Sequence, residues 1–305
     1  MVEMQPGGDT ILPARERGTM GQTIKTLDRD DILTAGLGKH SGHKYDYGHA
    51  LVLSGGAGRS GAARLAARAA LRVGAGAVTL GVPPSAQLEV AMQVTAVMLQ
   101  RVADAAALAD VLRDDRLNAL CLGPGFGLSD REEALVETAL ASGRACVLDA
   151  DALTLLARSD ALFDRLHEAC VLTPHGGEFA RLFPDLAQAL DRGTCDKPDA
   201  TRAAAKRAGC TVLLKGPQTV IADAAGACAI NDSTGARATP WLATAGAGDV
   251  LSGVITGLLA RGQPPFDAAG LGAWLHSESA RHFGPGLIAE DLPEALPPVF
   301  RALGL

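Results

Sequence analysis

The sequence lacks basic runs and long apolar stretches, and aromatic residues are scarce. Phe, Trp and Tyr make up 4% of the 305 residues, and the formal net charge at pH 7 is −6. Nothing in it resembles the basic, aromatic-rich surface with which proteins follow a nucleic-acid backbone. The apolar runs also stay shorter than the roughly 18 residues that a membrane-spanning helix needs. We expect no nucleic-acid partner and no membrane span.

The six cysteines include no CxxC pair. Most stand in or beside apolar segments such as "NALCLGPG" and "ACVLTP", where a small buried thiol fits. Free structural thiols are therefore the favoured interpretation, with zinc binding or a disulfide as the alternatives. The first twenty residues also lack the apolar core of a signal peptide. We expect a cytoplasmic protein.

What the sequence does contain is an alternation of strand-like and helix-like segments. Short aliphatic runs such as "HALVLSG", "AVTLGV" and "CTVLLKG" alternate with segments of helical period. This pattern predicts an α/β fold with a mainly parallel central sheet and helices on both faces. Residues 1–25 mix Gly, Pro and both charges without a periodic apolar face, which predicts a disordered leader before a single domain, 26–305.

Two local patterns add detail. In "GAARLAARAALRVG", apolar residues share one helical face, and Arg64, Arg68 and Arg72 share another, which we interpret as a solvated stripe. The segment 218–231 contains two short strand-like runs around a Gly turn. It predicts an antiparallel hairpin at the edge of the sheet.

The stretch "GGAGRSG" has glycines at 56, 58 and 61, the GxGxxG spacing of a dinucleotide-binding turn. About twenty residues further on, where that motif needs a ribose-binding acid, the chain reads "TLGVPP", and the first acid nearby is Glu89. We therefore favour a ligand-lining glycine turn of another fold. An NAD(P)-dependent oxidoreductase is the alternative from a different class.

The segment "TAGAGDVLSGVITGLLARG", 244–262, carries the clearest chemical signal. Apolar residues follow helical spacing from Val250, so a helix begins near Asp249. Gly246 and Gly248 allow the backbone to turn so that unpaired amides face outward, and the helix dipole favours an anion there. A carboxylate at this point can be an ordinary N-cap. The GxG turn favours instead a base beside amides that hold a phosphoryl group.

These residues resemble the ribokinase-like superfamily, whose kinases carry a GAGD turn with the Asp as catalytic base. "LTPHGGEFARLF", 172–183, is similar to the T-P-N-x-x-E segment of those kinases, with His175 in place of Asn. The T-P-H-x-G-E form resembles one branch, the ADP/ATP-dependent NAD(P)H-hydrate dehydratases. "CLGPGFG", "VLDADAL", "LLKGPQTVIAD" and "INDSTGARATPWL" extend the resemblance along almost the whole chain from about residue 35.

The resemblance implies a three-layer ribokinase-like fold and a hydro-lyase activity. The substrate would be the S epimer of hydrated NADH or NADPH, with Mg²⁺ and ADP, or ATP, as phosphoryl donor. The ring hydroxyl would be phosphorylated and phosphate eliminated, which restores the cofactor. A homotetramer is implied as well. Relatives are often fused to an epimerase domain, for which we expect no room in this chain.

The same resemblance assigns roles to particular residues. Asp249 is the implied base, and the amides of Gly246, Ala247 and Gly248 would stabilise the transferring phosphoryl group. The damaged dinucleotide would contact four residues: Ala62, Gly125, His175 and Asp249. The nucleotide would lie along one segment and one glycine: Lys215, Gly216, Pro217, Gln218, Thr219 and Gly248. Glu178 would act on Mg²⁺ through water.

Several of these residues also have local explanations. Gly125 would fit a plain strand-end turn, and Lys215 would fit a surface lysine whose stem covers apolar groups. Asn231 matches a family position near the nucleotide, yet a turn residue explains it too. Asp149 and Asp151 close a strand at the edge where open α/β sheets bind ligands, which gives them a supporting role.

Ala247 departs from the pattern of the branch. The dehydratase turn more commonly reads GGTGD or AGTGD, whereas Ala247 recreates the GAGD of sugar and vitamin kinases. A kinase for a vitamin precursor or a sugar is therefore the alternative function.

Overall fold

The aliphatic runs of the sequence form the strands of one ten-stranded sheet. The structure is a computed structural model and describes residues 24–40 and 42–305; residues 1–23 of the predicted leader lie outside the described residues. The strands are β1 (Ile24–Thr26), β2 (His49–Leu53), β3 (Ala77–Val82), β4 (Met98–Arg101), β5 (Leu117–Leu122), β6 (Ala145–Leu148), β7 (Cys170–Leu172), β8 (Thr211–Leu214), β9 (Gln218–Ala222) and β10 (Cys228–Asp232).

The sheet is mainly parallel, as predicted. Its order is β1-β10-β9-β8-β7-β6-β5-β2-β3-β4. Every neighbouring pair is parallel except the two that involve β9, which runs antiparallel to β8 and β10. The predicted hairpin is therefore confirmed, but its expected place at the edge is wrong. The short strand β1 pairs in parallel with β10, Ile24 opposite Cys228, and covers the edge that the hairpin would otherwise expose.

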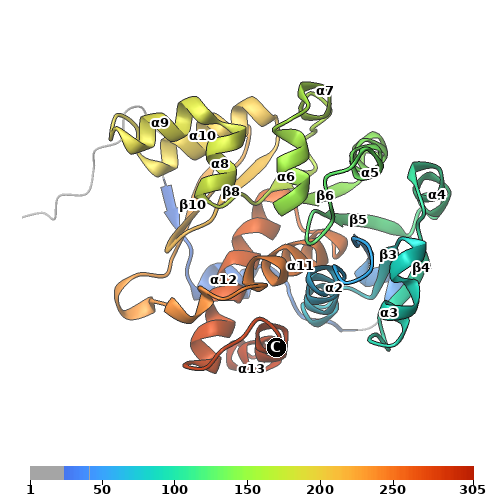
Figure 1. Ribbon diagram of the computed structural model, residues 1–305. Helices are drawn as coiled ribbons and strands as arrows, with labels where there is room; N and C mark the ends of the chain where they lie inside the picture. Colours follow the sequence, from blue (N-terminus) through green and yellow to red (C-terminus); the bar gives the residue numbers. More distant parts are fainter. Residues whose placement is uncertain (1–23, 41) are drawn as a thin grey trace, which may run out of the picture.

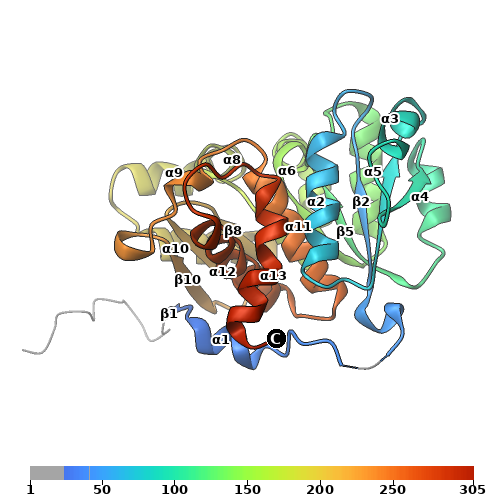
Figure 2. The same cartoon turned by 90° about the horizontal axis from the view of Figure 1, so that it is seen from below.

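Helices cover both faces of the sheet (Figure 1). In the view from below, α2, α11, α12 and α13 lie on one face, and α4, α5, α6, α8 and α10 belong to the other (Figure 2). The helices are α1 (Arg29–Thr34), α2 (Gly61–Arg72), α3 (Gln87–Ala91), α4 (Ala105–Val111), α5 (Asp130–Ala141), α6 (Ala150–Leu156), α7 (Asp160–Phe163), α8 (Gly176–Leu182), α9 (Pro184–Asp191), α10 (Lys197–Ala208), α11 (Ala247–Ala260), α12 (Pro265–Phe283) and α13 (Asp291–Leu303). Short 3₁₀ turns are η1 (Lys44–Tyr47), η2 (Pro84–Ala86), η3 (Gly235–Arg237) and η4 (Pro240–Leu242).

The central strands bury both of their faces. In β2, Ala50 and Val52 pack toward one helix layer, and Leu51 and Leu53 toward the other. Because neither face meets water, these strands appear in the sequence as continuous apolar runs instead of alternating ones. The three-layer α/β architecture is confirmed.

Two further features concern the cysteines and the length of the helices. All six cysteines are free, and five of them are buried. Among the residues that the structure describes, none of the helices combines the length and apolar character that crossing a bilayer requires.

The arginine stripe of α2 does more than face solvent. Arg68 Nε donates to Glu294 Oε1 at 2.6 Å, and Arg72 also pairs with Glu294. Glu294 lies in α13, so these exposed ion pairs hold the last helix against α2. The stripe is solvated, as interpreted, and two of its arginines also pair with a residue more than 220 positions away, which no local pattern indicated.

Helix α11 approaches α2 so closely that only glycine fits at the contact. A Cβ atom on Gly253 would lie 2.1 Å from the carbonyl oxygen of Ala66 in α2. A Cβ atom on Gly257 would lie 2.4 Å from Val73 and 2.6 Å from the carbonyl oxygen of Ala70. The two glycines therefore fix the distance between the helix that carries Asp249 and the helix that follows the "GGAGRSG" loop.

We expect Gly253→Ala to destabilise the protein by at least about 2 kcal/mol, because the added methyl group forces two backbones apart. The free energy of unfolding in urea would measure this. Gly61→Ala is the matched control: it lies in α2, and nothing stands within 4 Å of an added Cβ. We expect that variant to be unchanged or slightly more stable. Equal stability of the two variants would contradict the close approach.

Candidate active site

The predicted site residues follow strands that point the same way. Strands β2, β5, β6, β7 and β8 are parallel, so the loops after them meet at one edge of the sheet. From β2 the chain adds β3 and β4 on one side of the sheet, then returns to β5 and adds β6, β7 and β8 on the other side, so the strand order reverses between β2 and β5. Ligands of open α/β sheets bind at such a reversal.

At this reversal, the loops after β2 and β5 touch each other. A Cβ atom on Gly55 would lie 2.1 Å from the carbonyl oxygen of Gly125. Gly125 has a φ of +60°, and a Cβ there would lie 2.7 Å from the carbonyl oxygen of Arg59 and 3.4 Å from Cβ of Ala62. The structure thus brings Ala62 and Gly125 together, as predicted residues of one site.

The "GGAGRSG" turn is held by Glu89, the first acid after the position where a dinucleotide-binding fold needs its ribose-binding acid. Gly58 N donates to Glu89 Oε2 at 2.6 Å, and the Ser60 hydroxyl donates to the other carboxylate oxygen. Glu89 therefore fixes the turn itself. The glycine spacing is thus explained by the turn that Glu89 holds. The oxidoreductase alternative needs an acid that binds ribose, and Glu89 does not serve that purpose.

The "DAD" segment directs two carboxylates to two sides of the site. Ala150 has a φ of +45°, a left-handed conformation that is costly for a residue with a Cβ. Beyond this turn, Asp151 Oδ2 accepts from Gly127 N at 2.8 Å and pairs with Arg59 at 3.3 Å, which joins the two glycine loops. Before it, Asp149 faces the opposite way, toward α11 and β8.

Asp149 is 2% exposed and binds two side chains. Its Oδ1 accepts from Lys215 Nζ at 2.8 Å, and its Oδ2 accepts from Ser252 Oγ at 2.7 Å. Lys215 also lies 3.8 Å from Glu178 Oε2. Burial opposes the charge of Lys215, but the two carboxylates outweigh it and raise the pKa of Lys215 above its usual value. The alternative of a surface lysine is therefore wrong.

Asp249 lies in the first turn of α11, beside this cluster. Burial, followed by the charge of Asp149, raises the pKa of Asp249 to about 6, although Lys215 opposes the shift. The N-cap position belongs to Gly246, whose φ is +88°, and no side chain caps the helix. The Asp249 carboxylate accepts no hydrogen bond from any residue that the structure describes. The N-cap interpretation is therefore wrong.

Two backbone N–H groups at Asp249 have no hydrogen-bond acceptor among the described residues. The N–H groups of Gly248 and Asp249 bond to no described residue, as the first turn of a helix leads one to expect. A Cβ atom on Gly248 would lie 3.5 Å from Lys215 Nζ. A carboxylate, free amides and an ammonium group thus gather around one point, which suits a negatively charged reacting group.

His175 caps α8 with one ring nitrogen, and its other ring nitrogen, Nε2, lies 3.5 Å from Glu178 Oε1. Its Nδ1 accepts from Gly177 N at 2.9 Å, while Glu178 Oε2 accepts from His175 N at 2.8 Å. This capping box explains why an imidazole can stand where related kinases have Asn. Because Nδ1 accepts from an amide, the proton of the neutral ring is on Nε2, and the ring is 55% exposed. His175 can therefore donate to a ligand.

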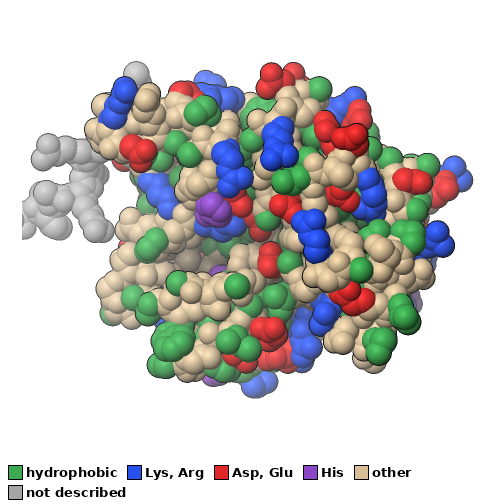
Figure 3. Space-filling model, viewed as in Figure 1, with side chains coloured by type: hydrophobic (Ala, Val, Ile, Leu, Met, Phe, Trp, Pro, Cys, Tyr) green, Lys and Arg blue, Asp and Glu red, His purple; other side chains and the backbone are tan. Residues whose placement is uncertain are grey.

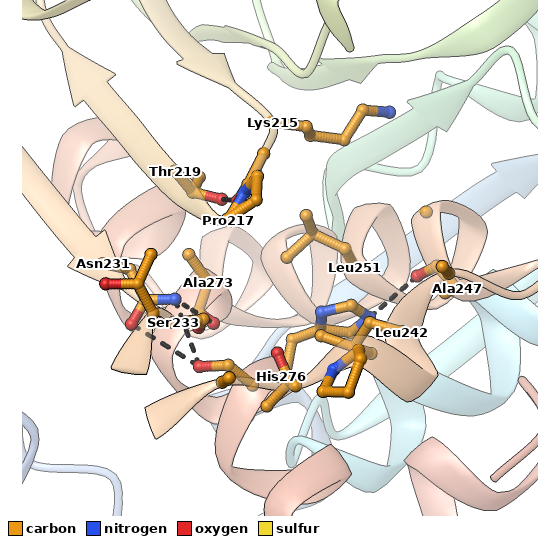
Figure 4. Close-up of a pocket in the computed structure, with 18 residues that line it drawn as sticks. Lys215, Pro217, Thr219, Asn231, Ser233, Leu242, Ala247, Leu251, Ala273 and His276 are labelled. Carbon is orange, nitrogen blue, oxygen red and sulfur yellow. Dashed lines mark hydrogen bonds between the residues drawn. The ribbon is translucent and has the colours of Figure 1, made fainter. Parts of the chain in front are cut away.

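A cavity of about 580 Å³ extends from Lys215 and Gly248 toward α12 (Figure 4). In the space-filling view, this face is hollowed, and acidic, basic and His side chains surround the opening (Figure 3). Five predicted nucleotide residues line the cavity: Lys215, Gly216, Pro217, Thr219 and Gly248. Gln218 does not line it, because its amide donates to Asp232 and the residue is exposed in β9.

Asn231 also lines the cavity, and its explanation as a turn residue is wrong. It lies in β10 and is 3% exposed. Its Nδ2 donates to the carbonyl oxygen of Ala273 and to Ser277 Oγ, both at 3.1 Å. These bonds fasten the hairpin to α12 and use both donors of the amide.

Two residues of the site were missed by the sequence analysis. Lys197 Nζ donates to the carbonyl oxygens of Lys215 and Gln218, at 3.1 and 2.5 Å, and burial lowers its pKa to about 8. His276 Nε2 lies 2.9 Å from the carbonyl oxygen of Ala247. A lysine at the first position of a helix opposes the helix dipole, and a histidine in the apolar stretch "LGAWLHS" is unusual. These were the available signals.

Comparison with known proteins agrees with this geometry. Residues 50–296 match the model of the NAD(P)H-hydrate dehydratase family. The chain belongs to that family. The ADP-dependent (S)-NAD(P)H-hydrate dehydratase of Neisseria meningitidis is 37% identical over 244 residues, which are 78% of either chain. The bifunctional NAD(P)H-hydrate repair enzyme Nnr of Moorella thermoacetica is 39% identical over 277 residues, 86% of this chain and 51% of that protein. The chain spans about half the length of such bifunctional relatives.

Solved structures of the family and of its fold align along nearly the whole chain. The Bacillus subtilis ADP/ATP-dependent NAD(P)H-hydrate dehydratase, co-crystallised with ATP and Mg²⁺, is 25% identical with a TM-score of 0.77 and covers 93% of this chain and 100% of that one. A ribokinase-like superfamily protein from Enterococcus faecalis has a TM-score of 0.79 at 22% identity, over 94% and 99% of the two chains. The ribokinase-like fold is confirmed.

We expect Asp249→Asn to be more stable than the wild type at neutral pH. The folded protein raises the pKa of Asp249 from 3.8 to about 6, so the wild type loses stability as pH rises from about 4 to about 6. The advantage of the variant in urea unfolding should therefore be larger at about pH 8 than at about pH 5. Asp185→Asn is the control with the opposite sign, because Arg207 lowers the pKa of exposed Asp185 to about 2. An advantage that does not change with pH would contradict the raised pKa.

We expect Lys197→Met to loosen the segment 215–219. The substitution removes the ammonium group that holds two carbonyl oxygens of this segment. Amide hydrogen exchange over 215–219 should become at least about tenfold faster, the result of losing roughly 1.4 kcal/mol of local stability. Lys206→Met, at an exposed position of the same helix, should leave exchange unchanged. Equal exchange in both variants would show that Lys197 does not hold the loop.

Proposed function

We propose that the chain catalyses the ADP-dependent dehydration of the S epimer of hydrated NADH or NADPH, with ATP as a second donor to be tested. The observation that carries this proposal is the placement of Asp249. It directly follows Gly248 of the cavity wall, beside free amides and the charges of Lys215 and Asp149. The Neisseria relative, whose name states ADP and the S epimer, supports the finer assignment.

In the proposed reaction, Asp249 takes the proton from the ring hydroxyl of the hydrated cofactor. A base with a pKa of about 6 is largely ionised at pH 7 and still close enough to that pH to accept a proton effectively. The hydroxyl oxygen would attack the terminal phosphorus of the donor, and the rest of the nucleotide, AMP in the case of ADP, would leave. The free amides of Gly246, Gly248 and Asp249 would stabilise the transferring phosphoryl group, whereas the Ala247 amide, also expected to do so, already donates to the carbonyl oxygen of Thr244 at 3.4 Å. Elimination of phosphate together with a ring proton then restores the reduced cofactor.

Two ligands would occupy opposite sides of Asp249. The donor nucleotide fits the cavity lined by Lys215, Gly216, Pro217 and Thr219. The damaged dinucleotide would contact Ala62 and Gly125, which lie together, and His175 at the start of α8. On this side, His175 supplies a donor from Nε2, and Gly125 permits a close approach of the ligand.

The acidic cluster fits a magnesium ion held mainly by the nucleotide. Among residues 24–40 and 42–305, no group of three or more His, Cys, Asp or Glu side chains has the geometry to hold a metal ion. Mg²⁺ in such sites takes most ligands from phosphates and water. Glu178, 7% exposed and fixed by His175 N, would orient one of these waters. When bound, the ion would neutralise charge on the phosphates.

Two expectations remain, the cellular compartment and the oligomeric state. Six free cysteines favour a reducing compartment such as the cytoplasm. The homotetramer stays a prediction.

Ala247 favours a second candidate, a kinase for a vitamin precursor or sugar. The turn "GAGD" has the form used by those kinases, and a base beside an anion site can serve either reaction. The two functions differ in their product: a kinase keeps the phosphate on the acceptor, whereas the dehydratase releases it.

The proposed function is tested by incubating the purified protein with hydrated NADH, Mg²⁺ and either ADP or ATP. We expect absorbance at the reduced-nicotinamide band to rise and inorganic phosphate to be released in equal amount. The nucleotide that supports the faster rise is the working donor. No rise with either nucleotide would contradict the proposal and favour the kinase.

We expect Asp249→Ala to lower kcat by at least about 100-fold, because general bases contribute about 10²–10⁴-fold to rates. The dissociation constant for ADP, measured by calorimetry, should change by less than about threefold, since Asp249 does not line the cavity. Asp185→Asn should leave both quantities unchanged. Normal turnover by the Asp249 variant would overturn its assignment as the base.

A further inference from the structure

His276 stands between the nucleotide cavity and the turn that carries Asp249. It lies in α12, is 8% exposed and lines the cavity (Figure 4). Its Nε2 is 2.9 Å from the carbonyl oxygen of Ala247, the first residue of α11. One imidazole thus faces the cavity and bonds to the turn whose amides would hold the phosphoryl group.

The bond to Ala247 fixes the tautomer of the ring. A carbonyl oxygen only accepts hydrogen bonds, so Nε2 must carry a proton. Burial is the main reason that the pKa of His276 falls to about 4, although the Ala247 carbonyl opposes the shift. The ring is therefore neutral near pH 7. A neutral ring with a proton on Nε2 has a lone pair on Nδ1, which makes Nδ1 an acceptor.

Nδ1 has no partner, and it is not sealed inside the protein. No residue in the described part of the chain hydrogen-bonds to it. Although it is unpaired, Nδ1 is not fully buried, so it keeps some accessible surface. The wall around it is largely apolar, with Leu242, Leu251 and Ala273 nearby in the cavity (Figure 4). The cavity also carries hydroxyl groups, among them those of Thr219, Thr239 and Ser277. An unpaired acceptor beside apolar side chains is an arrangement that orients a ligand.

We propose that His276 recognises the nucleoside part of the nucleotide, with Nδ1 accepting a hydrogen bond from an N–H of the base or an O–H of the ribose. This inference rests on the nucleotide site of the proposed function. A ligand without the matching donor would leave Nδ1 unpaired in an apolar wall, so His276 would set the specificity for the donor nucleotide. Through Nε2, the same ring would position the first turn of α11.

Two substitutions separate the two contacts. In His276→Gln, the amide nitrogen reaches the place of Nε2 and keeps a donor for Ala247, but the acceptor at Nδ1 is lost. In His276→Asn, the amide oxygen reaches the place of Nδ1 and keeps the acceptor, but the bond to Ala247 is lost. The thermal midpoint of each variant shows whether it is folded.

Calorimetry with ADP, IDP, 2′-deoxy-ADP and 3′-deoxy-ADP tests the proposal without any turnover. The wild type should bind one of the three analogues about tenfold more weakly than ADP, and that analogue identifies the donor group. IDP lacks the exocyclic amino group of adenine, and each deoxy analogue lacks one ribose hydroxyl. His276→Gln should bind ADP about tenfold more weakly and lose the preference, whereas His276→Asn should keep the preference.

A preference that survives in His276→Gln would overturn the proposal, as would a wild type that binds all four nucleotides alike. If the variants fail to fold, ¹⁵N NMR of the imidazoles in the wild type decides. Saturating ADP should shift the Nδ1 resonance of His276 upfield, the direction expected for a new hydrogen bond to an unprotonated nitrogen. An unchanged resonance would mean that the histidine is structural only. Failure of the proposed function looks different: ADP then does not bind at all, or binds without supporting dehydration.

Discussion

The buried ion pair between Lys215 and Asp149 is the interaction on which the site depends. It joins the ends of two strands, β8 and β6, and Ser252 extends it to α11. Burying two charges is expensive, and such a pair persists only when further hydrogen bonds complete it. Removing one partner leaves an uncompensated charge inside the protein, which costs about 3–5 kcal/mol in comparable cases. The pair therefore fixes the distance between the nucleotide wall and the helix of Asp249.

The ion pair leaves the site with an excess of acidic groups. Lys215 is shared between Asp149 and Glu178, and Asp249 stands close by without a hydrogen-bond partner among the described residues. Burial, and then the charge of Asp149, makes Asp249 hold its proton more tightly than an exposed carboxyl group does. The surroundings that raise this pKa also make the ionised form of Asp249 a source of instability. Buried carboxylates with raised pKa values are common at functional sites.

Local patterns in the sequence predicted the layers of the fold, the helix that begins near Asp249 and the glycine loops, because these depend on neighbouring residues. Long-range partners could not be found in this way. Glu294 pairs with α2, Glu89 holds the glycine turn, and β1 covers the hairpin, each through contacts between distant segments. Lys197 and His276 were missed for the same reason, since both act on backbone carbonyls that carry no signature in the sequence.

The reversed direction of β9 determines how one wall of the cavity is built. Because β9 runs against β8, a tight turn connects the two strands where a parallel pair would need a crossover helix. The start of β9 and the end of β10 therefore both lie at the edge of the sheet where β8 ends, beside the cavity. Ser233 N donates to the carbonyl oxygen of Pro217 at 2.8 Å and ties these two ends together. One wall of the cavity is therefore built from one continuous hairpin, whereas α11 and α12 supply the facing wall. Changes in the hairpin can reshape the first wall during evolution while the loops after the parallel strands stay the same.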